Sequence, residues 1–104
     1  MSYALDFHPL VDSDVRRIFA SIADYAGQGS AMRRVGAVIA ALDGLRIVPH
    51  KGSLRHGISP GLRAIGVGRT ATIAFTVHDD TRTVEVHMVA FGGEDWARLV
   101  RSRL

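Results

Sequence analysis

The spacing of apolar residues changes halfway along this chain, and that change restricts the possible folds more than any other feature. Between residues 11 and 46 apolar side chains recur every three or four positions, which is typical of one face of an α-helix. Between residues 62 and 91 they alternate with polar ones, which is typical of half-buried β-strands. The chain is therefore predicted to be an α+β protein of two layers, with helices on one face of a mainly antiparallel sheet.

The helical part divides at a glycine-rich break. Residues Val11–Ala26 and residues 30–46 each carry an apolar stripe, and residues 27–29 separate them. So short a connection predicts an antiparallel helical hairpin. The stripes consist of Val15, Ile18, Phe19, Ile22 and Tyr25 in the first helix, and of Met32, Val35, Val38, Ile39, Leu42 and Leu45 in the second.

Four segments are predicted as strands: residues 2–8, Leu62–Val67, residues 70–78 and Thr83–Phe91. A long loop is expected over residues 49–61, and a short helix from Glu94 onward. One alternating set in the last two strands is predicted to face the helices: Ala71, Ile73, Phe75, Val77, Val84, Val86, Met88 and Ala90. The opposite face is predicted to carry Thr70, Thr72, Ala74, Thr76, Glu85, His87, Val89 and Phe91. The residues expected to be nearly inaccessible to solvent are Ile22, Ile39, Phe75 and Val86.

Composition excludes several classes of protein. A chain of 104 residues is predicted to form a single domain over residues 1–104, too small for a full dinucleotide-binding fold or a TIM barrel. The absence of cysteine excludes disulfides, thiolate nucleophiles and zinc bound by sulfur. No apolar segment has membrane-spanning length and no signal-peptide pattern is present, so we expect a protein of the reducing cytoplasm. No cofactor is indicated, and His50 and His56 lack a third metal ligand at a recognisable spacing.

Short motifs in a fixed order add a resemblance. Residues 9–17 open the first helix, and the second helix is followed by Val48-Pro49-His50-Lys51-Gly52. Pro60-Gly61-Leu62-Arg63 then enters a strand, and Phe91-Gly92-Gly93-Glu94-Asp95-Trp96 closes the last one. Over nearly the whole chain this pattern resembles the RelE/ParE superfamily of bacterial toxins, and within it the ParE-like, plasmid-stabilisation branch. The resemblance implies the toxin of a type II toxin–antitoxin module, neutralised in a hetero-oligomer by a ParD-like antitoxin.

The resemblance leaves two kinds of target open. ParE-type members are associated with poisoning DNA gyrase, and RelE-type members with cleaving mRNA on the ribosome. RelE-type ribonucleases carry clustered lysines and arginines on the open sheet face, commonly with a tyrosine or histidine near the end of the last strand. Here Lys51 is the only lysine, both tyrosines precede residue 26, and Phe91 ends the last strand. We therefore expect a toxin that inhibits gyrase by binding; the alternatives are a ribosome-dependent endoribonuclease and a non-toxic interaction module.

Candidate site residues follow from these readings. If the protein is a ribonuclease, His87 is the candidate base, with Arg63 and Arg69 holding the phosphate charge. The net charge of +3 is carried almost wholly by arginine, which binds carboxylates and phosphates in a bidentate manner. Candidate target-binding residues are Lys51, Arg55, His56, Arg63, Arg69 and Trp96. For Trp96 the favoured alternative is packing on the protein's own core with Leu99.

An antitoxin surface is expected on the helical hairpin. Small residues between the apolar stripes leave room for an amphipathic partner helix, and the open sheet face can accept an extended segment. These small residues are Ala20, Ala31, Gly36, Ala37 and Ala40. The residues predicted to contact the antitoxin are Ile18, Ile22, Met32, Val35 and Phe91.

Overall fold

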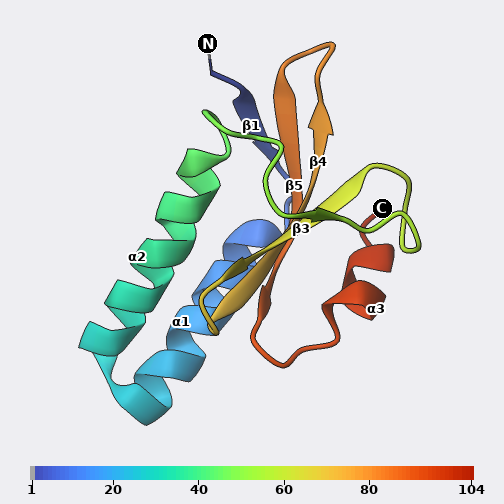
Figure 1. The fold of residues 1–104 in the computed structure, drawn as a ribbon. Coiled ribbons are helices and arrows are strands. Elements are labelled where there is room, and N and C mark those ends of the chain that lie inside the picture. The colour runs from blue at the N-terminus through green and yellow to red at the C-terminus, as the bar shows by residue number, and fades with distance from the viewer. Residues whose placement is uncertain (1) are drawn as a thin grey trace.

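The computed structural model describes residues 2–104 and contains a sheet with helices on both of its faces (Figure 1). The elements follow one another as β1 (Ala4–Phe7), α1 (Val11–Ala26), α2 (Gln28–Gly44), β2 (Ser53–Leu54), β3 (Leu62–Val67), β4 (Ala71–His78), β5 (Thr83–Phe91) and α3 (Trp96–Arg101). The strand order is β1-β5-β4-β3-β2, in which β1 runs parallel to β5 and all other neighbours are antiparallel. The predicted α+β architecture is confirmed. No helix within residues 2–104 is long and apolar enough to cross a membrane.

Helices α1 and α2 form the predicted hairpin on one face of the sheet (Figure 1). Gly27 alone connects them, with a φ of 87° that a residue with a side chain rarely adopts. The core between hairpin and sheet contains Val11, Ile18, Ile22, Val35, Val38 and Leu42 from the helices, and Ile73, Phe75, Val84, Val86 and Val89 from the strands.

Ile39 is not part of this core, contrary to the sequence prediction. Its side chain is 55% exposed, whereas Ile22, Phe75 and Val86 are fully buried as predicted. The physical reason is that α2 packs mainly on α1 and only lightly on the sheet. A narrow stripe of α2 is therefore covered, and Ile39 lies beside it at the surface.

A β-bulge in β5 reverses the predicted faces of its second half. Phe75 pairs with Val86, but Ala74 pairs with Met88, so His87 is an extra residue on β5. Val89 and Phe91 consequently belong to the core beneath the hairpin, while Met88 and Ala90 lie on the other face. The predicted faces of these four residues were wrong, because strict alternation takes no account of an inserted residue.

The face opposite the hairpin carries a second, smaller core beneath α3 (Figure 1). It consists of the buried residues Leu62, Ala74, Met88, Ala90 and Val100, with Ile58, Trp96 and Leu99 packed against them. The bulge makes this core possible, because it turns Met88 toward α3. Trp96 therefore packs on the protein's own core, as its favoured alternative predicted.

The edge of β5 has no neighbouring strand beyond the point where β1 ends. Strand β1 pairs with residues 83–86, so the outward backbone groups of residues 87–91 need other partners. Charged side chains supply them: Asp14 accepts the N–H of Val89, Glu94 accepts the N–H of Phe91, and Arg103 donates to the carbonyl of His87. Arg103 and Asp14 also form a bidentate, nearly buried ion pair, which ties the segment after α3 to α1.

The predicted loop of residues 49–61 contains the short strand β2, which the sequence did not indicate. Ser53 of β2 pairs with Ala64 of β3. Gly52, directly before β2, has a φ of 71°, and a Cβ atom there would lie 2.2 Å from the carbonyl oxygen of Ala64. Glycine at this position lets the loop backbone approach β3 closely enough to begin the pairing.

Candidate functional site

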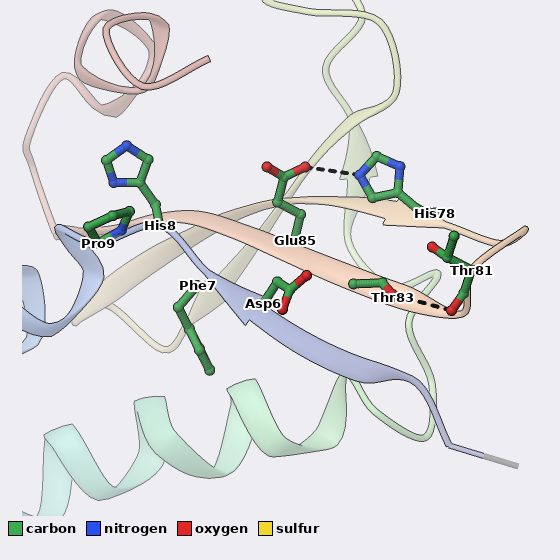
Figure 2. A pocket seen from close by; sticks show the side chains of 8 residues that line it. All are labelled: Asp6, Phe7, His8, Pro9, His78, Thr81, Thr83 and Glu85. Carbon is green, nitrogen blue, oxygen red and sulfur yellow. Dashed lines mark hydrogen bonds and ion pairs between the residues drawn. The ribbon is translucent and has the colours of Figure 1, made fainter.

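A polar cavity of about 520 Å³ lies on the face opposite the hairpin, at the end of the sheet that α3 leaves open (Figure 2). It is lined by Asp6, Phe7, His8, Pro9, His78, Thr81, Thr83 and Glu85. His8, Glu85 and His78 rise from the same side of the sheet, and Nε2 of His78 lies 2.9 Å from a carboxylate oxygen of Glu85. Because Asp6 and Glu85 bring two carboxylates together here, we name it the acidic cavity. Carboxylates favour a cationic or neutral ligand over a phosphate.

His87 lies on the same face but is enclosed. It is 5% exposed, and its Nε2 lies 2.8 Å from the hydroxyl oxygen of Thr76. Burial lowers the pKa of the His87 imidazole, and the neighbouring Glu85 carboxylate opposes that shift. The ring is thus held neutral, with one nitrogen engaged by a hydroxyl and little access for a substrate.

Arg63 and Arg69 do not converge with His87. Arg63 pairs with Phe75, and residues that pair directly across an antiparallel ladder point to the same face, so Arg63 lies on the side of the hairpin. Its guanidinium donates to the Lys51 carbonyl at 3.4 Å. Arg69 is exposed in the turn between β3 and β4. Arg63 therefore lies on the opposite face of the sheet from His87. Arg69 lies in a turn at the end of the strands, away from His87.

The remaining predicted target-binding residues divide into separate groups. The guanidinium of Arg55 lies over the Trp96 ring, 5.7 Å from its centroid, in a cation–π contact. His56 accepts the Gly61 N–H at 3.3 Å, which shapes the loop between β2 and β3. The Lys51 ammonium lies near Gly44 at the end of α2, apart from the pair of Arg55 and Trp96.

A cluster of Tyr3, His50 and Asp79 was not found by sequence reasoning. The Tyr3 hydroxyl donates to Asp79 at 2.7 Å, and His50 Nε2 lies 2.9 Å from the same carboxylate. These hydrogen bonds lower the pKa of Asp79, and the carboxylate raises the pKa of the Tyr3 hydroxyl. The cluster ties the segment before β1, the loop after α2 and the β4–β5 turn together. Within residues 2–104, no three His, Asp or Glu side chains come together in a way that could hold a metal ion.

Comparisons with known proteins give structural neighbours only. No family model matches the sequence, and no curated protein matches it significantly. A chromosomal ParDE toxin–antitoxin system from P. aeruginosa aligns with a TM-score of 0.72 and 18% identity, covering 86% of this chain and 95% of that one. Escherichia coli toxin RelE, as a mutant in the free state, aligns at 0.68 and 17%, covering 98% and 96%. The toxin–antitoxin complex RelBE2 from Mycobacterium tuberculosis aligns at 0.62 and 18%, covering 88% and 99%.

This chain has the RelE/ParE toxin fold. The alignments span most of this chain and nearly all of each neighbour, so the shared fold includes both the helical hairpin and the sheet. The recognised superfamily fold is confirmed, while identities of 18% and below leave the activity to be argued from the site itself.

Within this fold, three of the five predicted antitoxin-contact residues are buried in the free protein. Ile18, Ile22 and Val35 are buried between hairpin and sheet, because these positions form the stripe that faces the strands. Phe91 packs partly against the same core. Of the five, Met32 is well exposed at 67%. Apolar side chains at the surface of this layer also include Phe7 and Ile39, which were not predicted.

Sequence reasoning missed most of the acidic cavity. A signal was present, because Asp6 and His8 alternate with apolar residues of the first strand, as Glu85 does in the last. What the sequence lacks is the register: Asp6 lies beside Glu85 only because β1 pairs in parallel with β5. A strand pairing between residues so far apart in the chain leaves no local trace.

Proposed function

We propose that this protein is the toxin of a type II toxin–antitoxin module of the bacterial cytoplasm, kept inactive by a ParD-like antitoxin. The observation that supports a toxin is the alignment of nearly the whole chain with ParDE, RelE and RelBE2 structures. We further propose that it acts by binding a large target, DNA gyrase, rather than by breaking a bond.

The surroundings of His87 support binding over cleavage. A ribonuclease base must reach a ribose hydroxyl and work beside a cation that stabilises the phosphate. His87 is nearly inaccessible, its Nε2 is engaged by Thr76, and Arg63 lies on the other side of the sheet. The nearby carboxylates of Asp6 and Glu85 would repel the phosphates of RNA.

The proposed target-binding residues lie outside the acidic cavity and fall into separate groups on both faces of the sheet. They are Lys51, Arg55, His56, Arg63, Arg69 and Trp96. The guanidinium of Arg55 lies over the aromatic ring of Trp96. Arginine and tryptophan are among the residue types that contribute most binding energy at protein interfaces. Because these residues are distributed over loops, a strand and a helix, a partner that contacts several of them must be large.

A supercoiling assay with purified gyrase tests this function. We expect the toxin to inhibit supercoiling, and its induction in cells to trigger DNA-damage signalling while messenger RNA stays intact. Arg55→Gln should weaken inhibition several-fold, whereas Arg33→Gln, an exposed arginine of α2, should not. Unchanged gyrase activity at saturating toxin would overturn the choice of target.

A ribosome-dependent endoribonuclease is the alternative, and one observation favours it. His8, His78 and His87 lie on one face around Glu85, and imidazoles are the usual groups for general acid–base catalysis. Primer extension on a translated message after induction separates the two functions. New 5′ ends that disappear in His87→Ala would establish the nuclease, and the absence of growth arrest would indicate a non-toxic interaction module.

A further inference from the structure

Three arginines in and directly after α3 differ in their surroundings. Arg103 is enclosed, because its side chain is 11% exposed and forms the ion pair with Asp14. Arg98 and Arg101 are exposed. The Arg98 guanidinium lies 3.8 Å from the carboxylate of Asp95, in an exposed pair of the kind that contributes little, and Arg101 forms no ion pair within residues 2–104. The two arginines of α3 therefore keep their positive charge available to a partner.

Arg98 and Arg101 share the outer side of α3. The inner side of the helix carries the residues that pack on the second core: Trp96, Leu99 and Val100. Residues three apart on a helix are neighbours, with about 5–6 Å between their Cβ atoms, so the two arginine side chains leave α3 side by side. Because Arg103 fixes the segment after α3 to α1, both side chains extend from an anchored helix, which lowers the entropy cost of binding.

A third exposed guanidinium, that of Arg55, lies on the same side of the sheet. It lies over the ring of Trp96, 5.7 Å from the centroid, while the ring also packs against the second core. Little of the ring is left for a nucleobase, although proteins that bind single strands rely on exposed rings on which bases stack. We name Arg55, Arg98 and Arg101 the α3 surface. Within residues 2–104, the only carboxylate paired with any of them is that of Asp95.

We propose that the α3 surface binds the phosphate backbone of double-stranded DNA without reading its sequence. Guanidinium groups bind phosphate oxygens in a bidentate manner, and contacts to phosphates carry no sequence information. An acidic protein surface is a less suitable partner, because no large apolar side chain of α3 is exposed to form the core of a protein interface. The inference rests on the proposed function for the source of the DNA, which is the duplex that gyrase holds.

Fluorescence anisotropy of a short labelled DNA duplex, titrated with the purified toxin at several salt concentrations, tests this contact. Each phosphate contact contributes about 0.9 to the slope of log K against log salt, so Arg98→Gln with Arg101→Gln should reduce the slope by about 2 and weaken binding roughly tenfold at low salt. The matched control, Arg33→Gln with Arg34→Gln, removes two exposed arginines from α2 and should leave slope and affinity unchanged. Both variants should keep the original melting temperature, because all four side chains are exposed.

The outcomes separate this inference from the proposed function. If the α3 variant loses DNA affinity as expected but the original toxin does not inhibit gyrase, the DNA contact stands and the choice of target is overturned. If the toxin inhibits gyrase without binding the duplex, the target stands and the DNA contact is overturned. Equal weakening by the two double variants, or tighter binding to single-stranded RNA than to the duplex, also overturns the DNA contact, whatever the gyrase assay shows.

Discussion

At the scale of single residues, the charged and titratable side chains that the fold encloses are structural rather than exposed to a substrate. Asp14 and Arg103 satisfy backbone groups of β5 and each other, and no buried side-chain nitrogen or oxygen within residues 2–104 is left without a partner. Such pairs contribute little as ion pairs, yet removing one member leaves a charge enclosed without compensation. Individual substitutions should therefore have large effects on stability at Asp14 and small ones at exposed pairs.

Replacing Asp14 with Asn should lower the free energy of unfolding by about 3 kcal/mol, because it leaves Arg103 enclosed without a counter-charge. The side chains of this pair are 4% and 11% exposed. Urea denaturation measures the change. Asp12→Asn is a control on the same helix: Asp12 pairs with Arg16, and both side chains are more than three-quarters exposed. Its effect should stay below about 0.5 kcal/mol; equal effects would contradict a special role for Asp14.

Stability should fall as the pH drops below about 6.5, the ordinary value for histidine, because burial holds the pKa of His87 below it. In that window the unfolded chain binds a proton that the folded one does not, so acid favours unfolding. Urea midpoints between pH 5 and pH 8 record the effect. His87→Gln should flatten this dependence, while His56→Gln, at an exposed position, should leave it. If the urea midpoint of His87→Gln still falls with pH as in the original protein, another titrating group is responsible for the pH dependence.

At the scale of elements, β5 is the strand that pairs with both β1 and β4 and contributes side chains to both cores. The bulge at His87 shifts the alternation, so that Val86 and Val89 both face the hairpin while Met88 turns to α3. The sequence predicted the existence and bounds of β3, β5 and α1 correctly, because their apolar periods are long and regular. It did not predict the bulge, since an apolar run from residue 88 to 91 fits either alternation. For the same reason, the sequence could not predict how the candidate site residues lie relative to one another. The positions of His87 and Arg63 depend on the bulge and on strand register.

Neighbouring alanine substitutions on β5 should loosen opposite layers. Met88→Ala should lower the free energy of unfolding by about 2–3 kcal/mol and speed amide exchange in α3, because Met88 is 2% exposed in the second core. Val89→Ala should speed exchange in α1 instead, because Val89 is buried beneath the hairpin. Unfolding curves and residue-resolved exchange measure both. Loosening of the same helix by both variants would contradict the bulge.

At the scale of the whole molecule, residues distant in sequence are joined at one end of the sheet. Asp79 holds Tyr3 and His50, so one carboxylate links the N-terminal segment, the loop after α2 and the β4–β5 turn. The acidic cavity lies near this end, although the chain as a whole carries a net charge of +3. The sequence predicted the net charge, but not this local concentration of carboxylates.

Asp79→Asn should lower the melting temperature and raise amide exchange together in the three segments that Asp79 joins. Because its hydrogen bonds lower the pKa of Asp79 below 3.8, its ordinary value, the stabilisation is complete above that pH and is lost as the pH falls through the lowered pKa. Calorimetry at pH 7 and pH 3 tests this prediction. The melting temperatures of the variant and the original protein should differ less at pH 3 than at pH 7. Asp80→Asn is the adjacent exposed control. A constant difference would exclude ionisation of Asp79 as the cause.

The parallel pairing of β1 with β5 has a consequence during protein synthesis. Ala4 emerges from the ribosome early, but its partner Thr83 is 79 positions later in the chain. At translation rates of about 5–20 residues per second, the first strand waits roughly 4–16 s for its neighbour. Pairings over such separations form late in folding. A nascent chain therefore has neither the finished sheet nor the acidic cavity, which is lined by β1 and β5, until synthesis is nearly over.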